Sequence, residues 1–346
     1  MKTTSLDGPL ESTLTATAAA PMTAIVQHEY GSAAQDVLRL EKTARPAPGD
    51  DEVSVRVTAA SVDRGTWHIM AGLPYPIRLA GFGLRAPKPL NPGRSVAGTI
   101  ESVGNDVTEF APGDEVYGAC DGAFAEYACC QPGKLASKPA NLTFEEAAAV
   151  PISGLTALQA VRDHGHVQAG QRVLVVGASG GVGTFAVQIA KAFGAEVTGV
   201  CSTAKADLVR ALGADCVIDY TREDFTAGEQ RYDVILDTGG NRRLSDLRRA
   251  LTPRGRLVLV GGETGGRWLG GSERSIRALL LSPLVRQKLG TFIASENAAD
   301  LIVLRDLIEA GKVAPAIDRT YRLSETATAI THMQKGHARG KLVITV

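Results

Sequence analysis

The chain has 346 residues, which is long for one domain and typical of two. Its 37 basic and 37 acidic side chains balance, so no overall field favours nucleic acid or a membrane surface as a partner. The five cysteines lack metal and disulfide spacing, and no apolar run reaches transmembrane length; we therefore expect a cytoplasmic protein with reduced thiols, no nucleic-acid partner and no membrane partner.

Residues 1–21 are rich in Thr, Ser and Ala and contain no hydrophobic block. Asp7 and Glu11 argue against a transit peptide, and the missing apolar run argues against a signal peptide. We expect a disordered tail, with the fold beginning at residue 22.

Residues 22–140 read as short strands separated by glycines. Val53, Val55 and Val57 alternate with polar residues, as in a half-buried strand. Segments 98–104, 113–118 and 122–128 continue this pattern, which predicts a small barrel-like β domain. A Pro-rich loop at 74–93 carries three cations, and it is either a lid or a surface insertion: Arg78, Arg85 and Lys88.

An Ala-rich helical stretch at 144–161 leads into a strand, a glycine cluster and a helix over 173–194. The cluster has the pattern Ala178-x-Gly180-x-x-Gly183, which lets backbone N–H groups at a helix N-terminus approach a pyrophosphate. The alternative is a tight turn without a ligand. The expected cofactor contacts are Ala178, Ser179, Gly180, Gly181, Val182 and Gly183.

The next strand, 196–201, indicates which nucleotide is bound. A fold that uses NAD carries an acid here for the ribose 2′-hydroxyl, but this chain has Ser202 and Lys205, with no acid before Asp207. A hydroxyl and a lysine suit a 2′-phosphate, so we expect NADP(H). The alternative is a solvated lysine that opens a surface helix.

Further strands at 216–219, 233–237 and 256–260 alternate with helical segments. This alternation predicts an α/β fold with a Rossmann-type, doubly wound parallel sheet. Ligands bind at the carboxyl edge of such sheets, where we expect Thr238, Gly239, Gly261 and Gly262. The chain then continues with a helix at 298–310, a strand at 317–321, a helix after residue 324 and a strand at 341–345.

Two apolar stretches precede that last part. Residues 289–295 are expected to form the final edge strand of the parallel sheet. Residues 275–288 mix leucines with cations, and this segment lines the substrate cleft, covers a dimer edge or lies on a membrane surface. Pro283 interrupts it and weakens the membrane-helix interpretation.

Three segments together, 91–104, 149–157 and 177–183, resemble the medium-chain dehydrogenase/reductase superfamily on its zinc-independent quinone-oxidoreductase side. The resemblance implies a GroES-like β-barrel domain split around a Rossmann domain. The expected division is a tail at 1–21, the first part of the GroES-like substrate domain at 22–140, an NADP-binding Rossmann domain at 141–288, and an edge strand with the return to the substrate domain at 289–346.

The resemblance also implies roles for particular residues. Ser202, Lys205 and Tyr220 match positions that hold the adenosine 2′-phosphate, and Thr156 matches a nicotinamide-side contact. Arg339 and Lys341 fall in the closing segment that reaches back to the cofactor. It further implies a homodimer that pairs the edges at 289–295, with Phe292 and Ile293 buried between subunits.

The zinc-binding members supply Cys and His where this chain has Asp63, Arg94 and Ile152. An arginine cannot lose its proton to become a ligand, and isoleucine has no donor atom, so we expect no metal. Many quinone-reductase relatives have Asn where this chain has Asp63, which either binds near the nicotinamide or caps the neighbouring turn.

Hydride transfer from NADPH without a metal suits a quinone or an α,β-unsaturated carbonyl. The pocket candidates are Asp63, Thr66, Trp67, His68 and Tyr75, with no obligatory acid or base among them. Packing or surface exposure is the alternative for His68 and Tyr75. Two other functions stay open: an enoyl-thioester reductase of the same fold, and a non-catalytic NADPH-binding protein.

Overall fold

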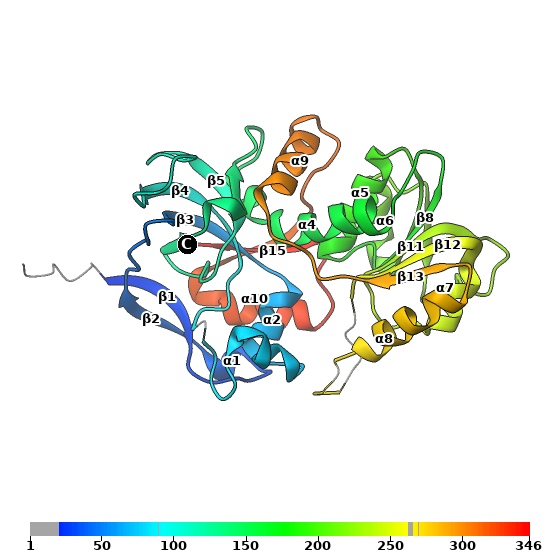
Figure 1. The fold of residues 1–346 in the computed structure, drawn as a ribbon, viewed down its shortest axis with the longest axis horizontal. Helices are drawn as coiled ribbons and strands as arrows, with labels where there is room; N and C mark the ends of the chain where they lie inside the picture. Colours follow the sequence, from blue (N-terminus) through cyan, green and yellow to red (C-terminus); the bar gives the residue numbers. More distant parts are fainter. Residues whose placement is uncertain (1–20, 89, 262–265, 269) are drawn as a thin grey trace, which may run out of the picture.

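Two large sheets of different kinds lie at the two ends of the molecule (Figure 1). The structure is a computed structural model and describes residues 21–88, 90–261, 266–268 and 270–346. The expected tail lies outside the described residues, apart from Pro21, which begins strand β1. Gly262 also lies outside them.

The first sheet is mostly antiparallel and is built around β3 (Val53–Val62), which pairs with β4, β6 and β15. Its strand order is β14-β15-β3-β4-β5-β7, and a separate hairpin of β1 and β2 lies beside it. The other strands are β1 (Pro21–Gln27), β2 (Leu38–Ala44), β4 (Ser95–Val103), β5 (Glu115–Ala119), β6 (Tyr127–Cys130), β7 (Leu135–Ser137), β14 (Ile317–Arg322) and β15 (Lys341–Thr345).

The expected strand at 122–128 is shifted along the chain. Residues 121 and 122 form a turn, Ala125 makes an isolated bridge to Ala24, and the strand proper is β6. The closing strand β15 lies antiparallel to β3, with Leu342 opposite Val62. The C-terminal end of the chain therefore completes a sheet whose other strands come mainly from its first 140 residues.

The second sheet is parallel, in the order β10-β9-β8-β11-β12-β13. Its strands are β8 (Arg172–Val176), β9 (Glu196–Cys201), β10 (Cys216–Asp219), β11 (Tyr232–Asp237), β12 (Leu251–Leu259) and β13 (Lys288–Thr291). Its helices are α5 (Gly181–Ala192), α6 (Ala206–Ala211), α7 (Leu244–Ala250) and α8 (Ser272–Leu281). The doubly wound parallel sheet expected from the sequence is confirmed. Its edge strand β13 is shorter than the expected 289–295, because it ends at Thr291, so Phe292 and Ile293 lie beyond it.

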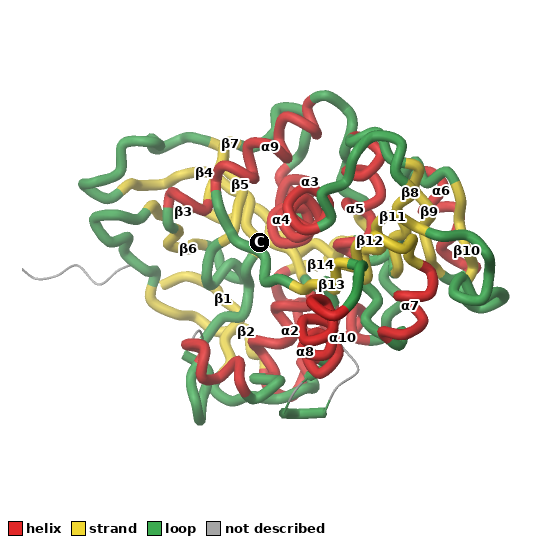
Figure 2. Tube along the Cα trace, turned by 45° about the vertical axis from the view of Figure 1, so that its right-hand side comes forward, coloured by secondary structure: helices red, strands yellow, loops and turns green. Residues whose placement is uncertain are grey.

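Helices fill the space between the two sheets (Figure 2). The single helical stretch expected at 144–161 is two helices, α3 (Phe144–Ala148) and α4 (Pro151–Gln159). The break precedes Pro151, which has no N–H to donate and fits only the first turn of a helix. The remaining helices are α1 (Ala34–Val37), α2 (Arg64–Ala71), α9 (Ala298–Glu309) and α10 (Thr326–Gln334).

One continuous apolar core joins these helices to the parallel sheet. Leu155 and Leu158 of α4 pack with Phe185 and Ile189 of α5 and with Leu304 of α9, and all five are fully buried. The core holds the start of α5 in place beside α4, where the glycine cluster lies. Within the described part of the chain, no helix combines the length and the apolar character needed to cross a membrane.

Candidate cofactor and substrate site

The glycine cluster forms the turn between β8 and α5, as the sequence predicts. Gly177 has φ +81°, and its carbonyl accepts a hydrogen bond from the Gly180 N–H at 3.0 Å. Helix α5 begins at Gly181, and its N-cap residue Gly180 provides no side-chain cap, whereas α3 is capped by Thr143 and α9 by Asn297. The N–H groups of the first turn of a helix have no partners within the helix. An uncapped start after glycines therefore suits a pyrophosphate.

Gly183 shows how tightly this turn is closed. A Cβ atom placed on Gly183 would lie 2.1 Å from the carbonyl oxygen of Gly177. Ala178, between them, is fully buried. Only glycine at 183 lets the first turn of α5 pack against the end of β8, so these residues fit a dinucleotide bound across the turn.

The carboxyl ends of β8 and β11 are tied together beside this turn. The Thr238 hydroxyl donates to the carbonyl of Val176 at 2.7 Å. The carboxylate of Asp237 accepts from the N–H groups of Gly239 and Gly240 at 3.2 and 3.1 Å. Thr238, Gly239 and Gly261 therefore lie at the edge where the glycine turn opens, as expected from the sequence.

Asp237 and Arg274 form an ion pair at this edge that sequence reasoning missed. Their side chains meet at 2.7 Å, and Asp237 is fully buried. Burial raises the pKa of Asp237 above its ordinary value of 3.8, and the Arg274 guanidinium opposes that rise. Arg274 also donates to the carbonyl of Gly261 at 3.1 Å. Arg274 of α8 thus ties this helix to the carboxyl ends of β11 and β12.

The three residues expected at the 2′-phosphate come from adjacent segments. Ser202 and Tyr220 directly follow β9 and β10, whose last residues are partners in the parallel pairing. The Lys205 ammonium donates to the carbonyls of Gly336 and Ala338 at 2.9 and 2.7 Å. Burial lowers the pKa of Lys205, the negative charge of Asp318 opposes this, and the nearby Arg339 guanidinium lowers it slightly further. Two basic side chains, Lys205 and Arg339, therefore lie near each other at this edge.

Asp219 places a carboxylate in the same region. It ends β10 and accepts hydrogen bonds from the hydroxyls of Thr203 and Thr221, which hold its pKa below the ordinary value of 3.8. Sequence reasoning missed it, because the acid of an NAD-binding fold is expected after β9, whereas Asp219 ends the neighbouring strand β10. The pairing of β9 with β10 brings it beside Ser202.

Lys341 confirms that the closing segment reaches the glycine turn. The Gly340 N–H donates to the carbonyl of Ser179 at 3.0 Å. The Lys341 side chain is buried, and its ammonium donates to the carbonyl of Val62 at 3.1 Å and to the hydroxyl of Ser153 at 3.2 Å. Burial lowers the pKa of Lys341, while the negative charge of Asp63 acts in the opposite direction.

Asp63 lies at the start of α2 and caps it, accepting from the Thr66 N–H at 3.4 Å. Its Oδ2 atom and the Thr66 hydroxyl are both buried and have no hydrogen-bond partner among the described residues. Two buried polar groups therefore remain available to a ligand, and Asp63 lies close to Lys341.

The other pocket candidates have partners of their own. The Trp67 indole N–H donates to the Ser32 carbonyl at 3.3 Å, and His68 bonds the Leu73 carbonyl at 2.8 Å. The Thr156 hydroxyl donates to the Ile152 carbonyl at 2.7 Å. Tyr75 stands edge-on to Trp268, with ring centroids 5.1 Å apart, and so connects the loop at 74–93 to the parallel-sheet domain.

The positions that hold zinc in zinc-binding relatives do not fit a metal ion here. The Arg94 guanidinium pairs with Asp121 at 2.8 Å and with Glu296 at 2.6 Å, and Ile152 is apolar. Among the residues that the structure describes, no group of three or more His, Cys, Asp or Glu side chains is arranged to hold a metal. A tetrahedral zinc site needs Cys, His or carboxylate donors, and neither an ion-paired guanidinium nor isoleucine supplies one.

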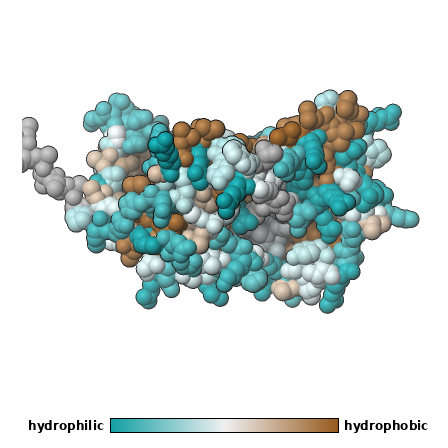
Figure 3. All heavy atoms as spheres, turned by 90° about the horizontal axis from the view of Figure 1, so that it is seen from below, coloured by the Kyte–Doolittle hydropathy of each residue, from teal (hydrophilic) through white to brown (hydrophobic). Residues whose placement is uncertain are grey.

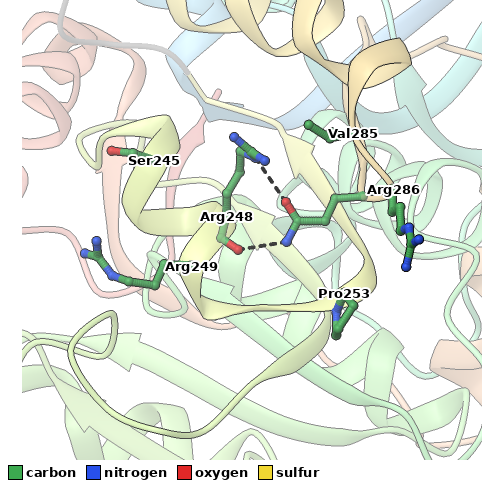
Figure 4. A pocket seen from close by; sticks show the side chains of 7 residues that line it. Ser245, Arg248, Arg249, Pro253, Val285 and Arg286 are labelled. Carbon is green, nitrogen blue, oxygen red and sulfur yellow. Dashed lines mark hydrogen bonds between the residues drawn. The ribbon is translucent and has the colours of Figure 1, made fainter.

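A surface pocket of about 370 Å³ lies elsewhere on the parallel-sheet domain (Figure 4). Arg248 and Gln287 hydrogen-bond each other across it, at 3.0 Å and 2.9 Å. Pro253, which also lines the pocket, lies near the amino end of β12. The glycine turn follows the carboxyl end of β8, so the pocket lies at the other edge of the parallel sheet.

Each of the two domains matches a known protein family. Residues 49–140 match the alcohol dehydrogenase GroES-like domain, and residues 212–344 match the family described as zinc-binding dehydrogenase. The mitochondrial NAD(P)H oxidoreductase RTN4IP1 of Mus musculus is 38% identical over 86% of this chain and 82% of its own length. The 2-methylene-furan-3-one reductase of Solanum lycopersicum is 34% identical over 91% of this chain and 77% of its own.

Solved structures show the same relationship. The quinone oxidoreductase from Coxiella burnetii superimposes with a TM-score of 0.79 at 29% identity, covering 94% of this chain and 100% of that one. The CurK enoyl reductase gives a TM-score of 0.78 at 26% identity, covering 94% and 99%. The chain is therefore an oxidoreductase of the medium-chain dehydrogenase/reductase superfamily, and it belongs to the quinone-oxidoreductase-like branch.

Proposed function

We propose that the chain is an NADPH-dependent oxidoreductase that works without zinc and reduces a quinone or an α,β-unsaturated carbonyl. The ion pairing of Arg94 with Asp121 and Glu296 carries the proposal of zinc independence, because Arg94 matches a zinc-ligand position of the relatives and its guanidinium cannot coordinate a metal. The relatives support the reaction class, since they include a quinone oxidoreductase and an alkenal/one oxidoreductase.

NADPH is the cofactor that the site fits best. The uncapped start of α5 suits the pyrophosphate, and Ser202, Lys205 and Tyr220 suit the 2′-phosphate, with Arg339 close to Lys205. When bound, this cofactor supplies a hydride. Asp219 stands in the same region, and the hydroxyls of Thr203 and Thr221 that bond its carboxylate keep it anionic, so Lys205 and Arg339 have to offset its repulsion of a phosphate.

The acceptor follows from what the protein offers in place of a Lewis acid. Reduction of a simple ketone places negative charge on one oxygen, and a metal normally stabilises it. A conjugated acceptor spreads that charge, so hydrogen-bond donors of the protein are sufficient without a metal. The buried Thr66 hydroxyl and the nearby Lys341 ammonium, which lies close to Asp63, are groups of this kind.

An enoyl thioester is the second candidate acceptor. The structural likeness to the CurK enoyl reductase favours it. The loop at 74–93 also carries Arg85 and Lys88, both exposed, which suit the phosphate of a phosphopantetheine arm.

A screen of NADPH oxidation over quinones, enals, enones, enoyl thioesters and simple aldehydes tests the proposal. We expect turnover with a quinone or an enone and little with simple aldehydes. Preference for enoyl thioesters would support the second candidate. Binding of NADPH without turnover of any acceptor would mean a non-catalytic nucleotide-binding protein.

The quaternary state and the location remain proposals. The β13 edge pairs with β12 and is the outer edge of the described sheet, as a dimer through this strand requires. Ile293 is 96% exposed in the single chain, whereas Phe292 already stacks on His164 of the same chain, with ring centroids 4.1 Å apart. We propose a homodimer in which Ile293 lies at the interface, and a cytoplasmic location.

A further inference from the structure

Exposed hydrophobic side chains concentrate in two short segments, 73–90 and 266–288. Fourteen large hydrophobic side chains are exposed among the described residues, and eight of them belong to these two segments. They are Leu79, Leu84, Leu90, Trp268, Ile276, Leu279, Leu280 and Leu284. Scattered exposed apolar residues are ordinary, but a gathering of this kind marks an interaction surface.

The two segments come from different domains and touch each other. The Tyr75 N–H donates to the carbonyl of Arg267 at 2.8 Å, and the Tyr75 ring meets the Trp268 ring. Pro74 packs so closely against Gly270 that a Cβ on Gly270 would lie 2.7 Å from it. Seen from below, hydrophobic surface gathers in two groups on either side of a notch (Figure 3). The segments therefore join at one place on the molecule.

Helix α8 presents an apolar face outward. Ile276, Leu279 and Leu280 are spaced as neighbours on one side of a helix and are 47%, 52% and 70% exposed. Ala278, on the other side, is fully buried in the domain core. Leu284 follows in a 3₁₀ turn and is 80% exposed. Pro283 lies in that turn, after the end of α8, so it does not interrupt the helix.

The same segments are strongly cationic, although the chain as a whole is neutral. Arg274 is neutralised by Asp237, and the only acid in the two segments is Glu273. The remaining cations are Arg78, Arg85, Lys88, Arg267, Arg277, Arg286 and Lys288. We call the exposed leucines, isoleucine and tryptophan together with these cations the apolar-cationic face.

We propose that the apolar-cationic face docks on the surface of an anionic lipid bilayer. Exposed leucines on a short helix enter the boundary between headgroups and acyl chains, and flanking Lys and Arg side chains contact anionic headgroups. A second copy of the chain is a poorer occupant, because a two-fold interface sets the same patch against itself and brings cations against cations.

This inference revises the expectation of no membrane partner, which rested on the overall charge balance. That balance conceals a local excess of cations beside exposed leucines. The inference does not depend on the substrate proposed above, since it concerns a surface and not the reaction.

Co-sedimentation of the purified full chain with lipid vesicles tests the proposal. We expect binding to vesicles of mixed phosphatidylcholine and phosphatidylglycerol, weaker binding to pure phosphatidylcholine, and a decrease as salt screens the charges. Leu280→Ser with Leu284→Ser should weaken binding roughly tenfold or more. Arg277→Gln with Arg286→Gln should weaken binding to anionic vesicles by a similar factor of about ten.

Ile302→Ser with Val303→Ser is the matched control, because these residues are also exposed but lie on α9, outside the face. Circular dichroism and NADPH binding check that each variant is folded. The proposal is overturned if the wild-type chain ignores anionic vesicles, or if the leucine variant binds them as well as the control does. It is also overturned if vesicles bind neither the wild-type chain nor the leucine variant, and the only effect of the leucine substitutions is a change from dimer to monomer in sedimentation velocity.

Discussion

The Lys341 ammonium donates a 3.2 Å hydrogen bond to the hydroxyl of Ser153, and both side chains are buried. Lys341 begins the last strand of the GroES-like domain, whereas Ser153 belongs to α4. A Cβ atom on Gly181, in the glycine turn, would lie 3.2 Å from each of these two side chains. One buried cation therefore connects the closing strand, the interdomain helix and the cofactor turn.

We predict that the free energy of unfolding rises with pH in the alkaline range because of Lys341. Burial holds the pKa of Lys341 below its ordinary value of 10.5. At a pH between the lowered pKa of the native protein and the ordinary pKa of the unfolded chain, the unfolded chain binds more protons than the native protein. The free energy of unfolding therefore increases with pH in this range. Below the native pKa, the destabilisation from burying the charged ammonium is present in full. Lys341→Met removes the titrating group and should flatten this slope.

Urea unfolding from neutral pH to 10.5 measures the slope. A conservative Lys341→Arg change keeps a cation at the site and serves as the comparison. Equal slopes for wild type and Lys341→Met would contradict the prediction.

Cofactor preference should depend on Lys205. Lys205→Glu sets a carboxylate against the 2′-phosphate and removes a charge-assisted hydrogen bond, so affinity for NADPH should fall by about tenfold to a hundredfold while NADH is less affected. Fluorescence titration with both nucleotides measures this. Lys312→Glu, at an exposed position just after α9, is the matched control. Equal binding of NADPH and NADH by the wild-type chain would refute the assignment.

Gly183→Ala should abolish cofactor binding by deforming the turn. The new methyl group would lie 2.1 Å from the Gly177 carbonyl, so the start of α5 has to shift, at a cost of about 1–3 kcal/mol in stability. Gly133→Ala is the control, because a Cβ there meets nothing within 4 Å. Calorimetric titration with NADPH reports the loss; retention of wild-type affinity in Gly183→Ala would show that the turn does not hold the cofactor.

The purified protein should contain far less than one zinc per chain, and chelators should leave its activity unchanged. The reason is chemical: the guanidinium of Arg94 is engaged by Asp121 and Glu296, and Ile152 offers no donor atom. Elemental analysis measures the metal content. Stoichiometric zinc, or loss of activity on chelation with recovery on adding zinc, would contradict the prediction.

The proposed homodimer is tested at Ile293. Ile293→Asp puts a charge opposite its own symmetry mate and should weaken association by roughly tenfold or more. Leu40→Asp, at an exposed site on β2, should not. Sedimentation velocity distinguishes the states. A wild-type chain that sediments as a monomer at micromolar concentration would exclude the dimer.

Local patterns predicted much of the fold. The glycine turn, the parallel strands and the edge strand β13 each follow from a few consecutive residues, because the relevant physics (glycine conformation, side-chain alternation, β-branching) acts over short distances. The sequence also contains the signal for the break before Pro151, because proline fits only the first turn of a helix.

Features that depend on long-range pairing were not predictable. Asp219 reaches the cofactor edge only because β10 pairs with β9, and Arg274 meets Asp237 only because α8 returns to the sheet. Lys341 is buried only because three segments of the chain meet around it. The family resemblance implied a cofactor contact for Lys341, but not its burial. A local propensity pattern carries no information on which residues from distant segments come into contact.

The central claim is that hydride passes from NADPH to a conjugated acceptor. It is tested most directly with NADPH carrying deuterium at the transferable position and an enone as acceptor, followed by mass spectrometry and NMR of the product. We predict one deuterium at the carbon β to the carbonyl, with the carbonyl intact. Deuterium on a carbinol carbon, or a product without deuterium, would contradict the account.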